Sequence, residues 1–305
     1  MTIPPDVCLL AADYGIGDHY IVAAFADAVR RQFDIGVWMA GRANLAFIAN
    51  LFPAIEHYVE SEPGRAALPA NAWKIEGGQI FYAHFPELEL MRAVGYNGFH
   101  FLDAYRCRLG LPATAFMSRP HLPSGEELAA AVQLLSENGF APGRTVVLSV
   151  EARSTPTDGV TAEFWIALAA ALQGQGLQAL VNAGPSTVVP TGMRALALPL
   201  TALRAVAESA GFFCSVRSGL SDLVCDLRCP QVVVYPDVRW WAGSLYAGAT
   251  FTRFGLKKVP FEVVLNPARR SEQIRTIVSH FEASAFGVSS LAKAKTVASS
   301  QSGFL

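Results

Sequence analysis

The stretch VCLLAADYGIGDHYIVAAFADAVRRQF, from Val7 to Phe33, decides the fold of this chain. Its first residues, Val7 to Ala12, form a continuous apolar run that predicts a buried strand. Gly15 and Gly17 follow, and then apolar residues recur with helical spacing. When a glycine turn joins a strand to a helix, the first backbone N–H groups of the helix and the positive end of its dipole point to one place. Asp18 lies at this point, where it either caps the helix or does chemistry.

Length and composition limit the classes of protein to consider. A chain of 305 residues suits two domains of about 150 residues each. A hydrophobic fraction of 52% and a charged fraction of 16% predict an extensive core. The net charge of −1 gives no bulk electrostatic reason to expect a nucleic-acid partner.

Targeting signals and cysteines give expectations about location and metals. No apolar run reaches the roughly 18 residues that span a bilayer, and the N-terminus lacks the basic leader of a signal peptide. We therefore expect a cytoplasmic protein with no transmembrane segment, able to associate peripherally with the inner membrane. The five cysteines form no CxxC pair, which favours reduced thiols and no metal site.

Strand-like and helix-like runs alternate in both halves of the chain. The alternation pauses at the linker-like residues 141–144 and restarts with the apolar run at 145–150. This order predicts an α/β protein with two Rossmann-like domains, whose parallel sheets face each other across a cleft. We expect an N-terminal domain over 1–140, a C-terminal domain over 141–287 and a flexible tail over 288–305.

The glycine turn after the first strand differs from a dinucleotide fingerprint. Its sequence, Gly15 to His19, lacks the third glycine of GxGxxG, because position 20 is Tyr. The second predicted strand also ends without an acidic residue to hold a ribose, which disfavours a nicotinamide cofactor. Asp18 suits a general base, and His19 is a second candidate for acid–base work. The alternative for Asp18 is a capping aspartate. The alternative for His19 is an ordinary histidine on the surface or in the first helical turn.

In the second domain, a group of polar residues follows each of the first two predicted strands. Arg153, Ser154 and Thr155 lie in the loop between the strand at 145–150 and the helix predicted from Thr161, where hydroxyls and an arginine suit a phosphate. Asn182 ends the next strand and could line a base or ribose pocket. The alternative for both groups is an ordinary polar loop or turn.

A third group, Arg217 to Asp222, follows the strand predicted over 212–216 and opens a helix. Ser218 and Gly219 permit close backbone approach, and Arg217 can fork onto a diphosphate. Asp222 could bond a sugar hydroxyl. The alternative is a capped helix start with a structural Arg–Asp pair. Farther along, Glu262 lies in an apolar stretch, and a buried acid there needs a partner.

Four motifs together resemble the bacterial ADP-heptose:lipopolysaccharide heptosyltransferase family, which has the GT-B fold. The four motifs are Gly17-Asp18, Leu109-Gly110-Leu111-Pro112, the loop Arg153 to Thr157 followed by Trp165, and Arg217-Ser218-Gly219 followed by Asp222-Leu223. Three positions depart from the family pattern. Arg217 replaces an Asp, Asp222 replaces a His, and the lysine of the phosphate loop is missing.

The resemblance implies an inverting, metal-independent glycosyltransferase without a cofactor. It would move a sugar from a nucleotide-diphosphate sugar to a hydroxyl of a glycan, glycolipid or protein. Asp18 would be the base, with Gly17 beside it. The donor would contact Arg153, Ser154, Thr155, Asn182, Arg217, Ser218, Gly219 and Asp222. The acceptor would lie near His19 and Gly77-Gly78.

Two other classes of protein stay open. One is a different GT-B enzyme, such as a nucleotide-sugar epimerase or a fucosyltransferase-like transferase. The other is a non-catalytic GT-B-like protein that binds nucleotide sugars or serves as a scaffold in polysaccharide assembly.

Overall fold

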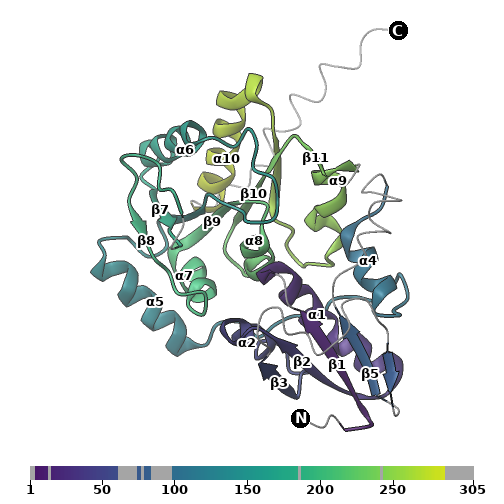
Figure 1. The fold of residues 1–305 in the computed structure, drawn as a ribbon. Helices are drawn as coiled ribbons and strands as arrows, with labels where there is room; N and C mark the ends of the chain where they lie inside the picture. The colour runs from purple at the N-terminus through teal and green to yellow at the C-terminus, as the bar shows by residue number, and fades with distance from the viewer. Residues whose placement is uncertain are drawn as a thin grey trace, which may run out of the picture.

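A computed structural model describes residues 4–12, 15–60, 74–76, 79–83, 98–184, 187–240 and 243–285. The chain forms two α/β units, one around each of two main sheets, joined at the centre of the molecule by α1 and α8 (Figure 1). The predicted acceptor residues Gly77-Gly78 and the predicted tail at 288–305 lie outside the described residues.

The first unit is built on a five-stranded sheet in the order β3-β2-β1-β5-β4. All its neighbouring strands are parallel except β4 and β5. Every residue of β1 is buried, which explains its unbroken apolar run. The strands are β1 (Val7–Ala12), β2 (Gly36–Gly41), β3 (His57–Glu60), β4 (Lys74–Glu76) and β5 (Gln79–Ala83). The helices are α1 (Ile16–Phe33), η1 (Ala43–Leu45), α2 (Ala46–Ala49) and α4 (Phe101–Arg108).

The second unit is built on a six-stranded parallel sheet in the order β13-β10-β9-β6-β7-β8. The strands are β6 (Thr145–Ser149), β7 (Gln178–Asn182), β8 (Ala195–Leu196), β9 (Gly211–Val216), β10 (Gln231–Pro236) and β13 (Phe261–Leu265). The helices are α5 (Gly125–Glu137), α6 (Ala162–Gly174), α7 (Leu203–Ala210), α8 (Gly219–Val224), α9 (Leu245–Ala249) and α10 (Arg270–Ala285), with the short helices η2 (Phe251–Arg253) and η3 (Pro267–Arg269). A two-stranded hairpin pairs β11 (Arg239–Trp240) with β12 (Gly243–Ser244).

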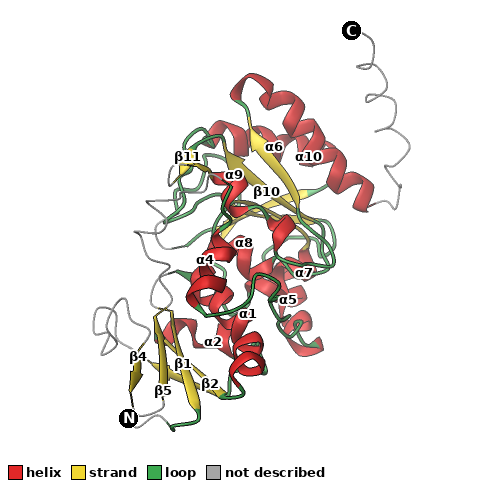
Figure 2. Ribbon diagram, turned by 90° about the vertical axis from the view of Figure 1, so that its right-hand side faces the viewer, coloured by secondary structure: helices red, strands yellow, loops and turns green. Residues whose placement is uncertain are grey.

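Alternate residues of the second sheet enter two different cores. Val146 and Leu148 of β6 pack with α6 and α10 on one face. Val147, between them in sequence, belongs to a core on the other face that continues through α7 and α8 into α1 of the first unit. Because successive strand residues point to opposite faces, one apolar strand serves both cores. The two units therefore share a continuous apolar core around α1 and α8. Figure 2 shows these two helices between the two main sheets.

Polar contacts also join the units. Within the second unit, Arg204 of α7 forms a buried ion pair with Asp226, with Nη1 and Oδ1 2.6 Å apart. Tyr20 of α1 donates a hydrogen bond to the same carboxylate across 3.2 Å. α5, which falls in the predicted N-terminal domain, packs against α7 of the second unit. The boundary at residue 140 stays a prediction.

Candidate functional site

Each sheet has a topological switch point, where the loops leaving adjacent parallel strands run in opposite directions. In the first sheet this point lies between β1 and β5, because the chain leaves β1 through α1 toward β2 on the other side. In the second sheet it lies between β6 and β9. Ligands of open α/β sheets bind at such points, beyond the carboxyl ends of the strands. The predicted site residues of the glycine turn, of 153–155 and of 217–222 follow these strands.

Asp18 lies in the first turn of α1 and is half-buried. Its Oδ2 accepts a hydrogen bond from the backbone N–H of Gly15 across 3.1 Å, so the carboxylate does cap the helix. Its Oδ1 accepts a hydrogen bond from the hydroxyl of Tyr105 in α4, across 2.5 Å. Capping does not exclude catalysis, because each carboxylate oxygen can accept more than one hydrogen bond. The role of Asp18 as a base stays a prediction.

His19 lies in the core. Its side chain is fully buried, and Nδ1 is 3.0 Å from the carbonyl oxygen of Ala12. Its ring meets Tyr58 edge-on, with centroids 5.6 Å apart. A Cβ at Gly41 would come within 2.5 Å of the imidazole, so β2 packs directly on this ring. The structure thus places the His19 ring in the core, and its acid–base role stays a prediction.

Arg217, the predicted diphosphate ligand, is engaged inside the protein. Its Nη2 is 2.8 Å from Oδ1 of Asp222, and its Nη1 donates to Oδ2 of the same carboxylate across 3.0 Å. Nε donates to the carbonyl oxygen of Ala249, and Nη1 also donates to that of Ser218. The guanidinium lies over the ring of Phe251. Arg217 and Asp222 are only 5% and 3% exposed, so the Arg–Asp pair is the arrangement present in this structure. The assignment of both residues to the donor stays a prediction.

Burial dominates the electrostatics of this pair. Loss of solvent raises the pKa of Asp222 from 3.8 to about 6, against the lowering effect of the Arg217 charge. The charge of Asp18 adds to the rise, which shows that the two carboxylates interact across the junction of the units. A buried bidentate pair of this kind holds the start of α8 in one conformation.

Two glycines allow α1 and α8 to meet. A Cβ at Gly219 would lie 2.5 Å from the backbone nitrogen of Gly17, and a Cβ at Gly17 would lie 2.4 Å from Oδ2 of Asp222. Ser218 is also buried, and its N–H donates to Oγ of Ser221. The structure therefore brings Gly17, Asp18, Ser218, Gly219 and Asp222 together, but Gly17 covers the N-terminus of α8 from the side of the first unit.

The loop after β6 is the accessible part of the site. Arg153 and Ser154 are exposed and Thr155 is half-buried, so their polar groups can reach a ligand. Asn182, at the end of the adjacent β7, is 9% exposed. Glu151 fixes the base of this loop, since its Oε1 accepts a hydrogen bond from the N–H of Val188 across 2.7 Å. Their assignment to the donor stays a prediction.

The acid Glu262 is half-buried and has hydrogen-bond partners. Its Oε1 accepts hydrogen bonds from the hydroxyl of Tyr235 and the N–H of Phe251, and its Oε2 accepts one from Thr250. The Tyr235 hydroxyl also donates to the carbonyl oxygen of Ala249, which accepts a second hydrogen bond from Nε of Arg217. This shared acceptor connects Glu262 and its donors to the Arg217–Asp222 pair. Glu262 is therefore part of the support of the site.

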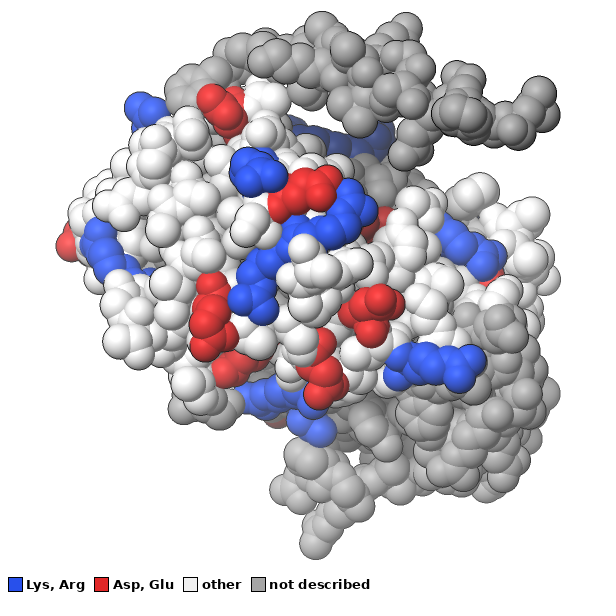
Figure 3. Space-filling view, turned by 90° about the horizontal axis from the view of Figure 1, so that it is seen from above, with Lys and Arg blue, Asp and Glu red and all other residues white. Residues whose placement is uncertain are grey.

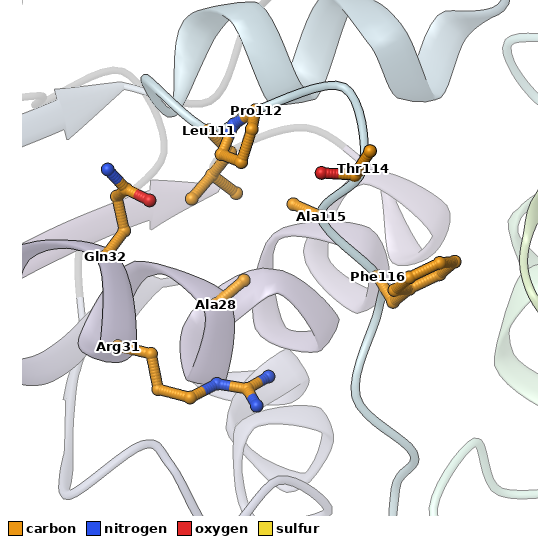
Figure 4. A pocket seen from close by; sticks show the side chains of 8 residues that line it. All are labelled: Ala28, Arg31, Gln32, Leu111, Pro112, Thr114, Ala115 and Phe116. Atoms are coloured by element: carbon orange, nitrogen blue, oxygen red, sulfur yellow. The ribbon is translucent and has the colours of Figure 1, made fainter.

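A shallow pocket of about 280 Å³ lies elsewhere, between the second half of α1 and the segment 111–116 (Figure 4). Ala28 and Arg31 line it from α1, and Leu111, Pro112 and Phe116 line it from the segment. At 1.5 Å per residue, Ala28 is about 15 Å along the helix from Asp18. This pocket is therefore separate from the switch points.

Charge and hydropathy of the described part of the chain add two observations. On the face in Figure 3, basic and acidic side chains lie interspersed, without a large area of one sign. Within the described residues, no helix combines the length and the apolar character that crossing a bilayer requires.

No protein-family model and no curated protein matches the sequence. Solved structures do match. The glycosyl transferase family 9 protein from Veillonella parvula DSM 2008 matches with a TM-score of 0.58, 13% identity and 89% coverage of both chains. The chain has the fold of a glycosyltransferase.

Two enzymes of Escherichia coli support this conclusion. ADP-heptose lps heptosyltransferase II gives a TM-score of 0.63 at 11% identity, covering 92% of this chain and 99% of the other. Heptosyltransferase WaaC with ADP gives 0.54 at 16% identity, covering 91% and 99%. These likenesses confirm the GT-B-like α/β fold and the resemblance to heptosyltransferases.

Sequence reasoning missed Tyr105 as a site residue. The spacing of residues in α4 places Tyr105 on one side of the helix with Phe101. It carries no signal that the hydroxyl meets a carboxylate 87 positions earlier, which only the packing of α4 against α1 reveals.

Proposed function

We propose that this chain is a glycosyltransferase that takes a nucleotide-diphosphate sugar as its donor. The observation that carries the proposal is the position of Asp18. It is a half-buried carboxylate at the switch point of the first sheet, beside the second unit, in a fold shared with heptosyltransferases over about nine-tenths of the chain. The heptosyltransferase WaaC structure contains ADP, which supports a nucleotide as the group recognised.

In the proposed reaction Asp18 takes the proton of an acceptor hydroxyl. The acceptor oxygen forms a bond to the anomeric carbon of the donor, and the bond from that carbon to the phosphate oxygen breaks. The diphosphate leaves with the electron pair, which gives inversion at the anomeric carbon in a single displacement. A positioned base contributes about 10²- to 10⁴-fold to the rate.

The leaving diphosphate gathers negative charge that fixed dipoles and cations must stabilise. Among the predicted site residues, Arg153 is the cation that is exposed to solvent, and Ser154 and Thr155 follow it in the chain with their hydroxyls. The proposal assigns the phosphate to this loop and leaves Arg217 a structural role. It requires no metal ion and no cofactor besides the donor. The acceptor, a glycan, glycolipid or protein, and the cytoplasmic location stay predictions.

The test compares two aspartates of the same helix. Asp18→Asn should lower turnover at least about a hundredfold while donor binding stays near normal. Asp27→Asn, which removes two ion pairs with the exposed Arg30 and Arg31, should leave turnover unchanged. Turnover that survives Asp18→Asn at saturating donor would refute the assignment of the base.

One observation favours a second candidate, a non-catalytic protein that binds nucleotide sugars or serves as a scaffold. Gly17 covers the N-terminus of α8, and Arg217 is used internally, so part of the predicted donor site is closed in this structure. A binding protein would show nucleotide-dependent stabilisation without sugar transfer, and a scaffold would show neither. Product analysis after incubation with donor separates both from the transferase.

A further inference from the structure

We propose that Tyr105 is the positioning residue that holds the Asp18 carboxylate in its reactive orientation. This inference rests on the proposed function. It begins from the 2.5 Å hydrogen bond that the Tyr105 hydroxyl donates to Oδ1 of Asp18. An O–H donor on a carboxylate at this distance makes a charge-assisted bond, which is stronger than a neutral one.

Helix capping alone leaves the Asp18 carboxylate incompletely fixed. The cap uses Oδ2 and the N–H of Gly15, three residues earlier on the same chain segment. The bond from Tyr105 comes from a different helix and holds the other oxygen. With one hydrogen bond on each oxygen, the plane of the carboxylate is set. Each oxygen keeps a lone pair for the proton of an acceptor hydroxyl.

The helix that carries Tyr105 is itself anchored. Tyr105 is 2% exposed, and its ring packs edge-on against Phe101. His100 caps α4 by accepting a hydrogen bond at Nδ1 from the N–H of Leu102. The other ring nitrogen of His100 lies 2.9 Å from the carbonyl oxygen of Thr250 in the second unit. These buried contacts let the tyrosine hydroxyl act as a rigid support for the carboxylate.

α4 also touches the ion pair of the second unit. The Arg217 guanidinium lies 5.4 Å from the centre of the Phe101 ring, one turn of α4 before Tyr105. α4 thus contacts Arg217, whose ion pair holds the start of α8, through Phe101, and it contacts the Asp18 carboxylate through Tyr105. The orientation of the Asp18 carboxylate therefore depends on how the two units pack against each other.

The test is a double-mutant cycle with a matched control. Tyr105→Phe keeps the ring and removes the hydroxyl, and it should lower kcat about 10- to 100-fold with KM for the donor changed less than about twofold. In the Asp18→Asn background the same substitution should change kcat less than about twofold, because Tyr105 acts only through Asp18. Tyr20→Phe, which removes a buried hydroxyl bonded to Asp226, should leave kcat unchanged.

A second measurement covers the case in which a variant folds poorly. The hydroxyl proton shared by Tyr105 and Asp18 should give a downfield proton NMR signal in the unmodified chain. Tyr20→Phe should retain this signal, and both Tyr105→Phe and Asp18→Asn should abolish it.

The outcomes separate this inference from the proposed function. An unchanged kcat in Tyr105→Phe, an equal loss in the Asp18→Asn background, or a downfield signal that survives Tyr105→Phe would overturn the role of Tyr105 while transfer by the unmodified chain stands. Absence of sugar transfer by the unmodified chain with every donor would refute the proposed function and the positioning role together.

Discussion

Replacing Arg217 with Met distinguishes a structural arginine from a ligand of the donor. The substitution keeps an unbranched apolar side chain and removes the charge. It leaves the Asp222 carboxylate, 3% exposed, without its cation, and it removes one hydrogen-bond donor from each of the carbonyl oxygens of Ala249 and Ser218. Breaking a buried pair by removing one partner destabilises proteins by about 3–5 kcal/mol.

Urea denaturation at pH 7 measures this loss. With an m-value of about 3 kcal/mol/M, the midpoint of Arg217→Met should fall by about 1 to 2 M. The loss should shrink as the pH drops, because the unpaired Asp222 carboxyl can then be protonated. Adding Asp222→Asn should recover part of the loss, since the double variant leaves no buried charge.

Arg153→Ala is the matched control for Arg217→Met. Arg153 is exposed, so its removal should change the free energy of unfolding by less than about 0.5 kcal/mol. It should weaken binding of a nucleotide diphosphate about tenfold in calorimetric titration, which corresponds to about 1.4 kcal/mol. A loss of less than about 1 kcal/mol in Arg217→Met, together with weakened nucleotide binding, would refute the structural interpretation.

Two further predictions test the junction of the units. Gly219→Ala should destabilise the protein by about 1–3 kcal/mol, because the new Cβ meets the backbone nitrogen of Gly17 at 2.5 Å. Gly174→Ala, whose Cβ meets nothing within 4 Å, is its control, and equal melting temperatures in the two variants would contradict the contact. Burial lowers the pKa of His100 from 6.5 to about 4. The folded state then binds fewer protons than the unfolded state between these values, so about 3 kcal/mol should be lost as the pH falls through this window. Denaturation at pH 7, 5.5 and 4.5 should show a smaller pH dependence in His100→Gln, and an unchanged dependence would contradict the assignment.

Local patterns predicted the elements that position the site. The apolar run at 7–12 matches β1, and Ser124, a residue type that favours helix N-caps, accepts a hydrogen bond from the N–H of Glu127 at the start of α5. The strand and the helix cap each depend on residues that lie within a few positions of one another, so the sequence alone is enough to recognise them. β13 was missed because Glu262 interrupts its apolar run. The strands of the hairpin, β11 and β12, are too short to show the alternation of apolar and polar residues that predicts a strand.

Long-range pairing limited the prediction of the site. The sequence shows an arginine at the end of a strand, but the same residue types suit a phosphate ligand and an internal ion pair. The burial of Arg217 and its distance to Asp222, which the sequence does not contain, show that the internal ion pair is formed. In the same way, His19 follows a candidate base in sequence but points into the core. The hydrogen bond between Tyr105 and Asp18 depends on packing between distant helices.

A thermal-shift panel of UDP, GDP, ADP, CMP and dTDP sugars tests the central claim most directly. A ligand at about 100 times its dissociation constant stabilises the folded state by about 2.7 kcal/mol. We expect at least one nucleotide-diphosphate sugar to raise the melting temperature of the unmodified chain and of Asp18→Asn equally, and Arg153→Ala to need a higher donor concentration for the same rise. No shift with any member of the panel would contradict the claim that this chain binds a nucleotide-sugar donor.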